Sequence, residues 1–232
     1  MAYVEMQPAA ALRPWIECFW SVRSDEPSAA QRILPDGCAD LVFDLTSGEN
    51  MVVGTMTAPV VLPPGGRADF VGVRFRPGCA AAFLRMPLAE VTDDRVPLAD
   101  VWRGWDGRTD LQSLQAELLR RLDDRRDRRL DTAVSRVVAT GGALRIDDLA
   151  RDIGISRQHL ARLFLHHVGV PPKAFARIIR FRGVVSELAT AGGQRDWADI
   201  AAHHGYYDQA HLTAEFRQLA GTTPGTFHFS NR

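Results

Sequence analysis

Short runs of hydrophobic residues, some alternating with polar ones, dominate the first hundred residues and are separated by Gly and Pro. Runs of this length and pattern are typical of β-strands that are buried on one or both faces. The runs are LVFDL (41–45), MVVG (51–54), APVVLP (58–63) and DFVGVRF (69–75). The pattern therefore predicts an α+β N-terminal domain with a small β-barrel-like sheet.

Two helices are predicted within the same region. The apolar residues of Pro14–Ser21 fall on one helical stripe, which predicts a helix there. These stripe residues are Trp15, Ile16, Phe19 and Trp20. A second, short helix is predicted over Ala80–Arg85, directly after the sequence PGC.

Near residue 110 the hydrophobic period becomes that of an α-helix. Leucines recur every three or four residues, so Asp110–Asp124 is predicted to be an amphipathic helix. The leucines of this stripe are Leu111, Leu114, Leu118 and Leu122. Such an apolar face packs either on its own domain or on a second copy, and we expect a homodimer through this helix or the N-terminal domain. The charged run RRLDDRRDRRLD (120–131) is interpreted as a solvated helical surface.

The rest of the chain is predicted to be all helical, with breaks at the GG pairs at 141–142 and 192–193. The chain therefore divides into an N-terminal sensing or dimerisation domain (1–106), a linker helix (107–126) and an all-α C-terminal domain (127–232). Residues 1–108 hold 10 Arg/Lys against 14 Asp/Glu, whereas residues 109–232 hold 18 against 14. The basic half indicates a polyanionic partner on one side only.

The C-terminal domain contains one sequence pattern twice. Gly154 matches Gly205 at an offset of 51, and one inserted residue then makes the offset 52. The other matched pairs are Leu149-Ala150 with Ile200-Ala201, His159-Leu160 with His211-Leu212, Phe164 with Phe216, Gly169 with Gly221, Pro172 with Pro224, and Phe175 with Phe227. The domain is therefore predicted to hold two copies of one structural unit.

The spacing within each copy indicates a helix-turn-helix. Ala four residues before Gly lets two helices cross closely, and Gly supplies the positive φ of a sharp turn. Ser156 and Asp208 then stand as N-caps of the second helix of each unit. Proline begins the segment after each unit, and Lys173–Thr190 is long enough to join the two units as one helix. In a helix-turn-helix the second helix enters a DNA major groove.

The stretches DLARDIGISRQHLARLF and IAAHHGYYDQAHLTAEFRQLAGTTPGTF resemble the AraC/XylS family of bacterial transcription regulators, over about residues 127–232. The first hundred residues resemble, through LPDGCADL (34–41) and GVRFRPG (72–78), an N-terminal domain of some such regulators. The resemblance implies sequence-specific binding of double-stranded DNA, RNA polymerase as a partner if the protein activates transcription, and a sensing or dimerising N-terminal domain.

The exposed face of each recognition helix supplies the candidate base-reading residues. Arg pairs bidentately with guanine and Gln with adenine, whereas Ala214 stands where many family members have Arg. The candidates are Arg157, Gln158, Ala161 and Arg162 on the first helix and Gln209, Ala210, Thr213 and Ala214 on the second. Arg217 on the second helix is a further DNA-binding candidate, either for a phosphate contact or for solubility. Solvent-exposed filler is the alternative for these side chains. Three arginines of the joining helix are candidates either for phosphate contacts or for solubility: Arg177, Arg180 and Arg182.

The N-terminal domain offers a candidate effector site. Aromatic residues and a few polar groups are typical of a small-molecule pocket, although each of these aromatics taken singly is more often a core residue. The candidates are Trp20, Cys38, Asp40, Phe43 and Arg74. The alternatives are a domain that only dimerises, and a thiol or redox sensor through Cys38.

Catalysis, cofactors and metals are not expected. The chain has no G-x-S-x-G elbow and no phosphate-binding loop, and all seven histidines lie at or after residue 159. Adjacent histidines at 166–167 and 203–204 point apart by about 100° on a helix. Hydrophobic residues at 46% and charged residues at 24% are ordinary for a soluble protein, and no apolar stretch is long enough for a membrane span. We therefore expect a cytoplasmic protein without a membrane partner.

Overall fold

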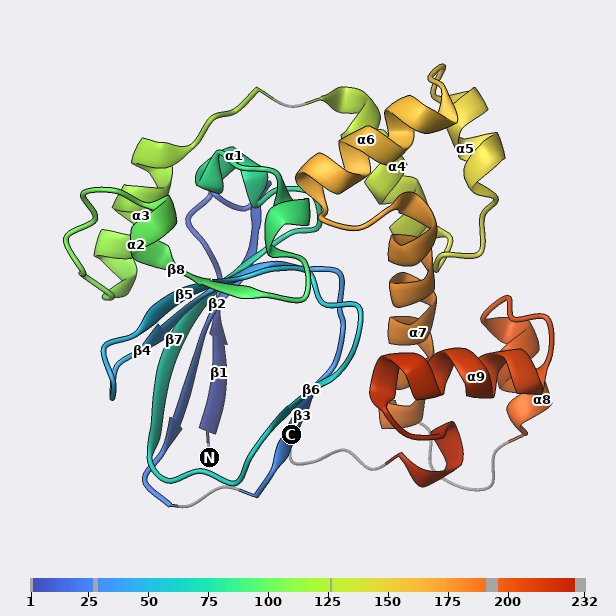
Figure 1. The fold of residues 1–232 in the computed structure, drawn as a ribbon, viewed down its shortest axis with the longest axis horizontal. Coiled ribbons are helices and arrows are strands. Elements are labelled where there is room, and N and C mark those ends of the chain that lie inside the picture. Colours follow the sequence, from blue (N-terminus) through green and yellow to red (C-terminus); the bar gives the residue numbers. More distant parts are fainter. Residues whose placement is uncertain (1, 27–28, 126, 191–195, 228–232) are drawn as a thin grey trace.

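The computed structural model describes residues 2–26, 29–125, 127–190 and 196–227. It confirms an α+β N-terminal domain followed by an all-α C-terminal domain, and the two pack side by side (Figure 1). The predicted break at 192–193 lies outside the described residues. In the described part of the chain no helix is long and apolar enough to cross a membrane.

The N-terminal domain is built on a six-stranded antiparallel sheet in the order β1-β2-β7-β4-β5-β8. Strands β3 and β6 form a separate antiparallel pair. The strands are β1 (Ala2–Met6), β2 (Ile16–Ser24), β3 (Gln31–Ile33), β4 (Asp40–Asp44), β5 (Asn50–Val53), β6 (Val60–Leu62), β7 (Ala68–Phe75) and β8 (Arg95–Pro97). All four hydrophobic runs predicted as strands are therefore strands.

The helix predicted over Pro14–Ser21 is wrong, because this segment enters β2. Strand β2 lies between β1 and β7, so both of its edges form hydrogen-bonded ladders that a short helix could not replace. A register shift between Ile16 and Cys18 lets Ile16 and Phe19 both reach the core, which imitates helical spacing in the sequence.

Helices cover one face of the sheet and close the N-terminal core (Figure 1). They are α1 (Ala81–Leu84), the 3-10 helix η1 (Leu88–Val91), α2 (Leu98–Val101) and α3 (Leu111–Arg121). The helices predicted over Ala80–Arg85 and Asp110–Asp124 are thus present. Leu114 and Leu118 of α3 are fully buried in this core, so the leucine stripe packs on its own domain.

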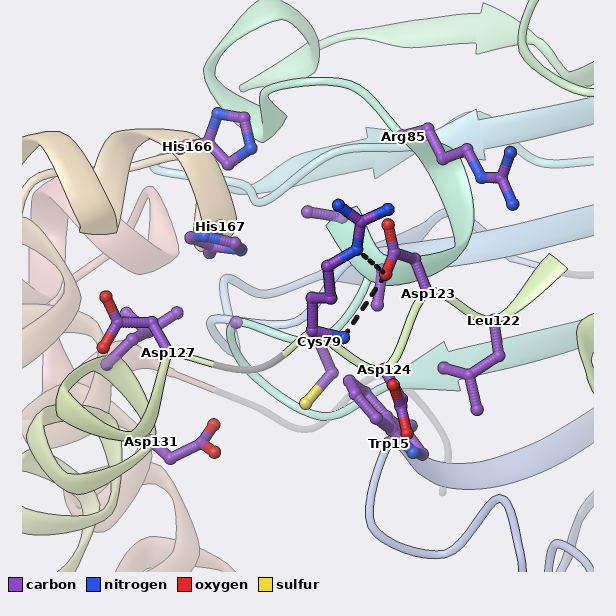
Figure 2. A pocket seen from close by; sticks show the side chains of 15 residues that line it. Trp15, Cys79, Arg85, Leu122, Asp123, Asp124, Asp127, Asp131, His166 and His167 are labelled. Atoms are coloured by element: carbon purple, nitrogen blue, oxygen red, sulfur yellow. Dashed lines mark hydrogen bonds and ion pairs between the residues drawn. The ribbon is translucent and has the colours of Figure 1, made fainter.

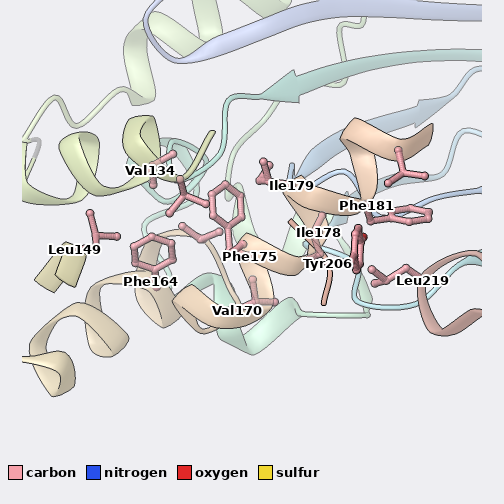
Figure 3. Close-up of a cluster of buried hydrophobic side chains, with 14 of the residues drawn as sticks. Val134, Leu149, Phe164, Val170, Phe175, Ile178, Ile179, Phe181, Tyr206 and Leu219 are labelled. Atoms are coloured by element: carbon pink, nitrogen blue, oxygen red, sulfur yellow. The ribbon is translucent and has the colours of Figure 1, made fainter. Parts of the chain in front are cut away.

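The C-terminal domain is a set of helices around one core. Its elements are α4 (Arg128–Ala139), α5 (Ile146–Asp152), α6 (Arg157–His167), α7 (Pro172–Thr190), α8 (Trp197–His203), α9 (Gln209–Ala220) and the 3-10 helix η2 (Pro224–Thr226). Figure 3 shows part of the core along α7, including Phe164, Phe175 and Phe181. The Phe175 ring lies 5.8 Å from that of Phe164, and the Phe181 ring lies 5.1 Å from that of Phe216, between centroids. Because both repeats bury their phenylalanine against α7, this helix joins them into one body.

Among the described residues, hydrogen bonds from Thr55, Thr92 and Arg182 join the two domains. Thr55 Oγ1 donates to the Val168 carbonyl at 2.6 Å, and Thr92 Oγ1 donates to the Gly169 carbonyl at 2.7 Å. These carbonyls directly follow α6, where a helix leaves its last C=O groups without partners. The N-terminal domain therefore supplies hydrogen bonds to the C-terminal end of α6. The third contact runs from Arg182 Nη1 on α7 to the carbonyl of Asp36 at 3.0 Å.

Candidate functional site

The first repeat is a helix-turn-helix made of α5 and α6. Gly154, with φ of +71°, makes the turn, and the Ser156 side chain accepts a hydrogen bond from the His159 N–H at the start of α6. Leu160 and Phe164 lie four residues apart on α6 and are fully buried. Arg157, Gln158 and Arg162, on another face of α6, are exposed to solvent.

The second repeat has the same construction from α8 and α9. Gly205 also has φ of +71°, and the Asp208 side chain accepts a hydrogen bond from the His211 N–H at 2.7 Å. Leu212 and Phe216 are fully buried, like their counterparts on α6. The matched turn angle and caps mean that the sequence repeat is also a structural repeat.

The structure places all nine candidate DNA-binding residues on the accessible faces of α6 and α9. Two are partly exposed, Ala161 and Thr213, and the other seven are exposed: Arg157, Gln158, Arg162, Gln209, Ala210, Ala214 and Arg217. On α6, Arg162 Nη2 lies 3.3 Å from His159 Nδ1.

The three arginines of α7 that were candidates for phosphate contacts all have partners within the protein. Arg177 Nε donates to Glu215 Oε1 at 2.7 Å, and Arg180 Nη2 donates to the Gly142 carbonyl at 2.9 Å. Arg182 makes the contact with the N-terminal domain described above. These side chains therefore hold parts of the protein together.

Glu215 is a functional candidate that the sequence reasoning missed. It lies on α9 with 9% of its surface exposed, and besides Arg177 it has Arg180 Nη1 at 4.0 Å and His211 Nε2 at 3.4 Å. The guanidinium of Arg180 also lies over the Tyr206 ring at 5.2 Å. The sequence signal that could have identified Glu215 is its position directly before Phe216, which the repeat predicts to be buried.

A groove of about 780 Å³ lies between the two repeats. Arg157 of α6 and Ala214 of α9 both border it, and α7 contributes Lys173, Arg177 and Arg180. More cationic than acidic side chains line this groove, and the acidic ones are Asp147 and Glu215. The two recognition helices thus open onto one shared, positively charged groove.

Tyr207 is a second residue that the sequence reasoning missed. It is 92% exposed and directly precedes Asp208, the N-cap of α9. A large aromatic side chain gains nothing for the fold at such a position. Its place beside the exposed N-terminal end of α9 makes it a candidate for a contact with a partner.

The structure brings four of the five candidate effector residues together on the sheet. Asp40 Oδ1 accepts a hydrogen bond from Trp20 Nε1 at 2.9 Å and lies 3.3 Å from Arg74 Nε. Arg74 also pairs with Asp36 at 3.5 Å, and the buried Cys38 thiol lies 3.7 Å from Glu17 Oε2. We call Trp20, Asp36, Cys38, Asp40 and Arg74 the polar cluster.

Phe43 does not belong to the polar cluster. Side chains alternate along a strand, so residues 40 and 43 of β4 face opposite sides of the sheet. Phe43 is fully buried in the core and contacts Trp105 at a ring-centroid distance of 5.3 Å. The expectation that it lines an effector site with the other four is therefore wrong.

Burial controls the ionisation of the polar cluster. Loss of hydration raises the pKa of Asp40 to about 6, although Arg74 and the Trp20 N–H oppose this shift. Burial also raises the pKa of the Cys38 thiol well above its usual value, and the Asp36 carboxylate adds to this effect. Burial acts to lower the pKa of Arg74, but Asp40 and Asp36 outweigh it and the net shift is upward.

A second cavity, of about 600 Å³, lies at the junction of the two domains (Figure 2). Trp15 and Cys79 border it from the N-terminal domain, Asp127 and Asp131 from α4 and its N-cap, and His167 from the end of α6. Burial lowers the pKa of His167. This cavity is separate from the polar cluster, which contributes none of its lining.

Comparisons with known proteins agree with the repeat. Residues 149–228 match the model of a helix-turn-helix domain, and residues 4–97 match a domain of unknown function (DUF6597). Residues 149–228 are an AraC-type helix-turn-helix domain. The AraC-type domain thus spans α5 to η2, with most of α5 and both recognition helices inside the match.

The curated relatives of this chain include the invasion protein InvF of Salmonella typhi and of Salmonella typhimurium. Each is 29% identical over 85 residues, which is 37% of this chain. The match spans 38% of the length of these relatives.

Similar solved structures include the C-terminal domain of AraT, a response regulator from Geobacillus stearothermophilus. This structure has a TM-score of 0.40 and 18% identity, and the match covers 44% of this chain and 84% of that one. An apo ToxT variant from Vibrio cholerae has a TM-score of 0.43 at 12% identity and covers 97% of this chain and 94% of its own.

Proposed function

We propose that this chain is a sequence-specific DNA-binding transcription regulator in which α6 and α9 contact one duplex together. The observation that carries the proposal is the pair of capped recognition helices that border one cationic groove. A duplex that contacts α6 and crosses this groove reaches α9. Recognition helices that act as a pair enter successive major grooves, about 34 Å apart.

In this proposal α6 reads bases most strongly. Arg162 and Gln158 are exposed side chains whose donors and acceptors match guanine and adenine edges. Ala161 leaves space for a thymine methyl group between them. Arg157 lies at the N-terminal end of α6 and pairs with Asp147 at 2.8 Å, so a phosphate would compete with that carboxylate.

Helix α9 positions the duplex and reads less of its sequence. Ala210 and Ala214 offer only methyl groups, so Gln209 and Thr213 supply the polar contacts with bases. Arg217 is exposed on the same helix and is proposed to contact a phosphate. Docking without strong base contacts orients the protein but specifies little.

We further propose that a small molecule bound at the polar cluster controls DNA binding. Asp36 belongs to the cluster through its carboxylate and contacts α7 through its carbonyl, which accepts from Arg182. A ligand that competes for Arg74 would therefore shift a loop that touches the helix between the two repeats. A metabolite screen by thermal unfolding tests this assignment. A compound that raises the melting temperature of the parent is expected not to raise that of Arg74→Gln.

Two alternatives for the N-terminal domain receive different support. A redox sensor through Cys38 needs a reactive thiolate, whereas this thiol is buried and its raised pKa disfavours the thiolate. A domain that only dimerises stays a prediction, as does contact with RNA polymerase. We propose no catalytic role for the chain.

The test of DNA binding is selection of duplexes from a random pool with the full chain. We expect enrichment of a bipartite site with two half-sites about one helical turn, or roughly 10 base pairs, apart. The half-site contacted by α6 is expected to carry the stronger base preference. A pool that stays random after repeated rounds would overturn the proposal.

A further inference from the structure

A cluster of two histidines and one glutamate lies where α8 meets α7. Within the described residues, Glu187, His203 and His204 form the group of three whose ligand atoms all lie within 4.8 Å of one another. Glu187 belongs to α7, His203 is the last residue of α8, and His204 is the C-cap of α8. The contacts already described for DNA and for the polar cluster use none of these side chains.

The imidazole of His204 is held in place before any ion arrives. Its Nε2 lies 2.8 Å from Glu187 Oε2, and the side chain is 14% exposed. The ring packs over Gly183 of α7, where an added Cβ would lie 2.8 Å from Nδ1. Helix α7 therefore fixes both the position of the ring and the direction of Nε2.

His203 supplies the third donor from the exposed side. Its ring centroid lies 4.9 Å from that of His204, with the ring planes at 85°. Helical geometry predicted that these adjacent histidines would diverge, but their side chains turn back toward each other. Because His203 is exposed, its ring can move to complete a site without disturbing the core.

We propose that Glu187, His203 and His204 bind one divalent transition-metal ion of the Zn²⁺ or Ni²⁺ class. Two imidazoles and one carboxylate suit these ions better than Mg²⁺ or Ca²⁺, which prefer oxygen ligands. Ligand atoms about 2.1 Å from a tetrahedral ion lie about 3.4 Å apart, so His204 Nε2 and Glu187 Oε2, now 2.8 Å apart, would separate by about 0.6 Å to admit the ion. Water would complete the coordination.

The ion would clamp the second helix-turn-helix onto α7. In its absence, one hydrogen bond between His204 and Glu187 joins these side chains of α8 and α7. A metal bound to groups on both elements would stabilise the folded state, because the site does not exist in the unfolded chain. Metal supply would then set how firmly α9 is held relative to α6.

The test is a titration of the full chain, carrying no affinity tag, with Co²⁺ followed by Zn²⁺. We expect Co²⁺ d–d absorption bands that saturate at one ion per chain, that lack a sulfur-to-cobalt charge-transfer band, and that Zn²⁺ abolishes. His203→Ala and Glu187→Gln change residues that are at least partly exposed, and each is expected to weaken binding by about tenfold or more. Zn²⁺ is also expected to raise the melting temperature of the parent but not of Glu187→Gln.

The chain carries its own control for this experiment. His166 and His167 are also adjacent, at a ring-centroid distance of 4.6 Å, near the end of α6 in the first repeat. No third ligand joins them among the described residues. His166→Ala is therefore expected to bind Co²⁺ like the parent. Absence of saturable binding, or equal binding by Glu187→Gln, or loss of binding in His166→Ala, would overturn the site.

Discussion

Glu215 of α9 accepts a hydrogen bond of 2.7 Å from Nε of Arg177 on α7, and this contact fixes the second recognition helix on the helix that joins the repeats. Arg180, one turn further along α7, lies 4.0 Å from the same carboxylate and donates to the Gly142 carbonyl at the turn between α4 and α5. The relative orientation of α6 and α9 therefore depends on contacts that α7 makes with both repeats.

Replacing Glu215 by Ala is expected to lower the free energy of unfolding by about 2–3 kcal/mol, because two arginines lose a nearly buried carboxylate. The estimate is below that for a fully buried pair, since Arg177 is about one-third exposed. Gln218→Ala removes the exposed partner of Arg177 and is expected to change stability by less than about 0.5 kcal/mol. Urea unfolding of both variants measures the difference, and equal effects would refute the role of Glu215.

Thr55→Val is expected to destabilise the protein by about 1–3 kcal/mol, because the buried Val168 carbonyl loses its donor while the volume is unchanged. Thr132→Val is the matched control, since the Thr132 hydroxyl donates to the Arg128 carbonyl on the solvent side of α4. Its effect is expected to stay within about 0.5 kcal/mol.

The contacts of Thr55 and Thr92 with the end of α6 also predict that residues 127–232 alone bind DNA but lose protection from hydrogen exchange at the end of α6. Unchanged protection there would contradict a role for the domain contact.

The C-terminal domain could be predicted because its signals are local. A glycine with positive φ, a capping side chain three residues before the N–H that it accepts, and two apolar residues four apart all lie within one unit. The wrong helix at Pro14–Ser21 came from a signal that is not local. Pairing of β2 with β7 joins residues 44 to 59 positions apart, and the shift between Ile16 and Cys18 imitated a helical stripe.

The candidate site was predictable to a similar extent. The exposed faces of α6 and α9 follow from the inward positions of Leu160 and Leu212, so the exposure of the DNA-contact candidates could be predicted. The partners of Arg177 and Arg180 depend on how α7 crosses α9, which no local pattern encodes. Phe43 was misplaced because a hydrophobic residue in an alternating run fits either face until the register of the strand is known.

The raised pKa of Asp40, about 6, predicts a loss of stability as pH rises. The folded state binds this proton more tightly than the unfolded state, so the stabilisation is fully present below about pH 4 and is lost as pH rises through about 6. Asp40→Asn is expected to flatten this part of the stability profile, because it removes the titrating group. Unfolding measured from pH 4 to pH 7 tests the sign, and a profile identical in parent and variant would contradict it.

Arg162→Ala is expected to cost about 1–3 kcal/mol of DNA-binding free energy and to relax preference at one base pair. Thr213→Ala is expected to cost less and to alter the selected sequence less, because α9 has no arginine among its candidate base-reading residues. Site selection with both variants beside the parent measures the two effects. If Thr213→Ala scrambled the selected site and Arg162→Ala left it intact, the roles of the two helices would be reversed.

The most direct measurement of the central claim is fluorescence anisotropy of the full chain on the selected duplex and on a scrambled duplex across a salt series. The structure predicts tighter binding to the selected duplex by about a thousandfold or more. It also predicts a slope of roughly −5 for log affinity against log salt, as for about six phosphate contacts. Equal affinity for both duplexes, or an affinity that does not change with salt, would contradict the account.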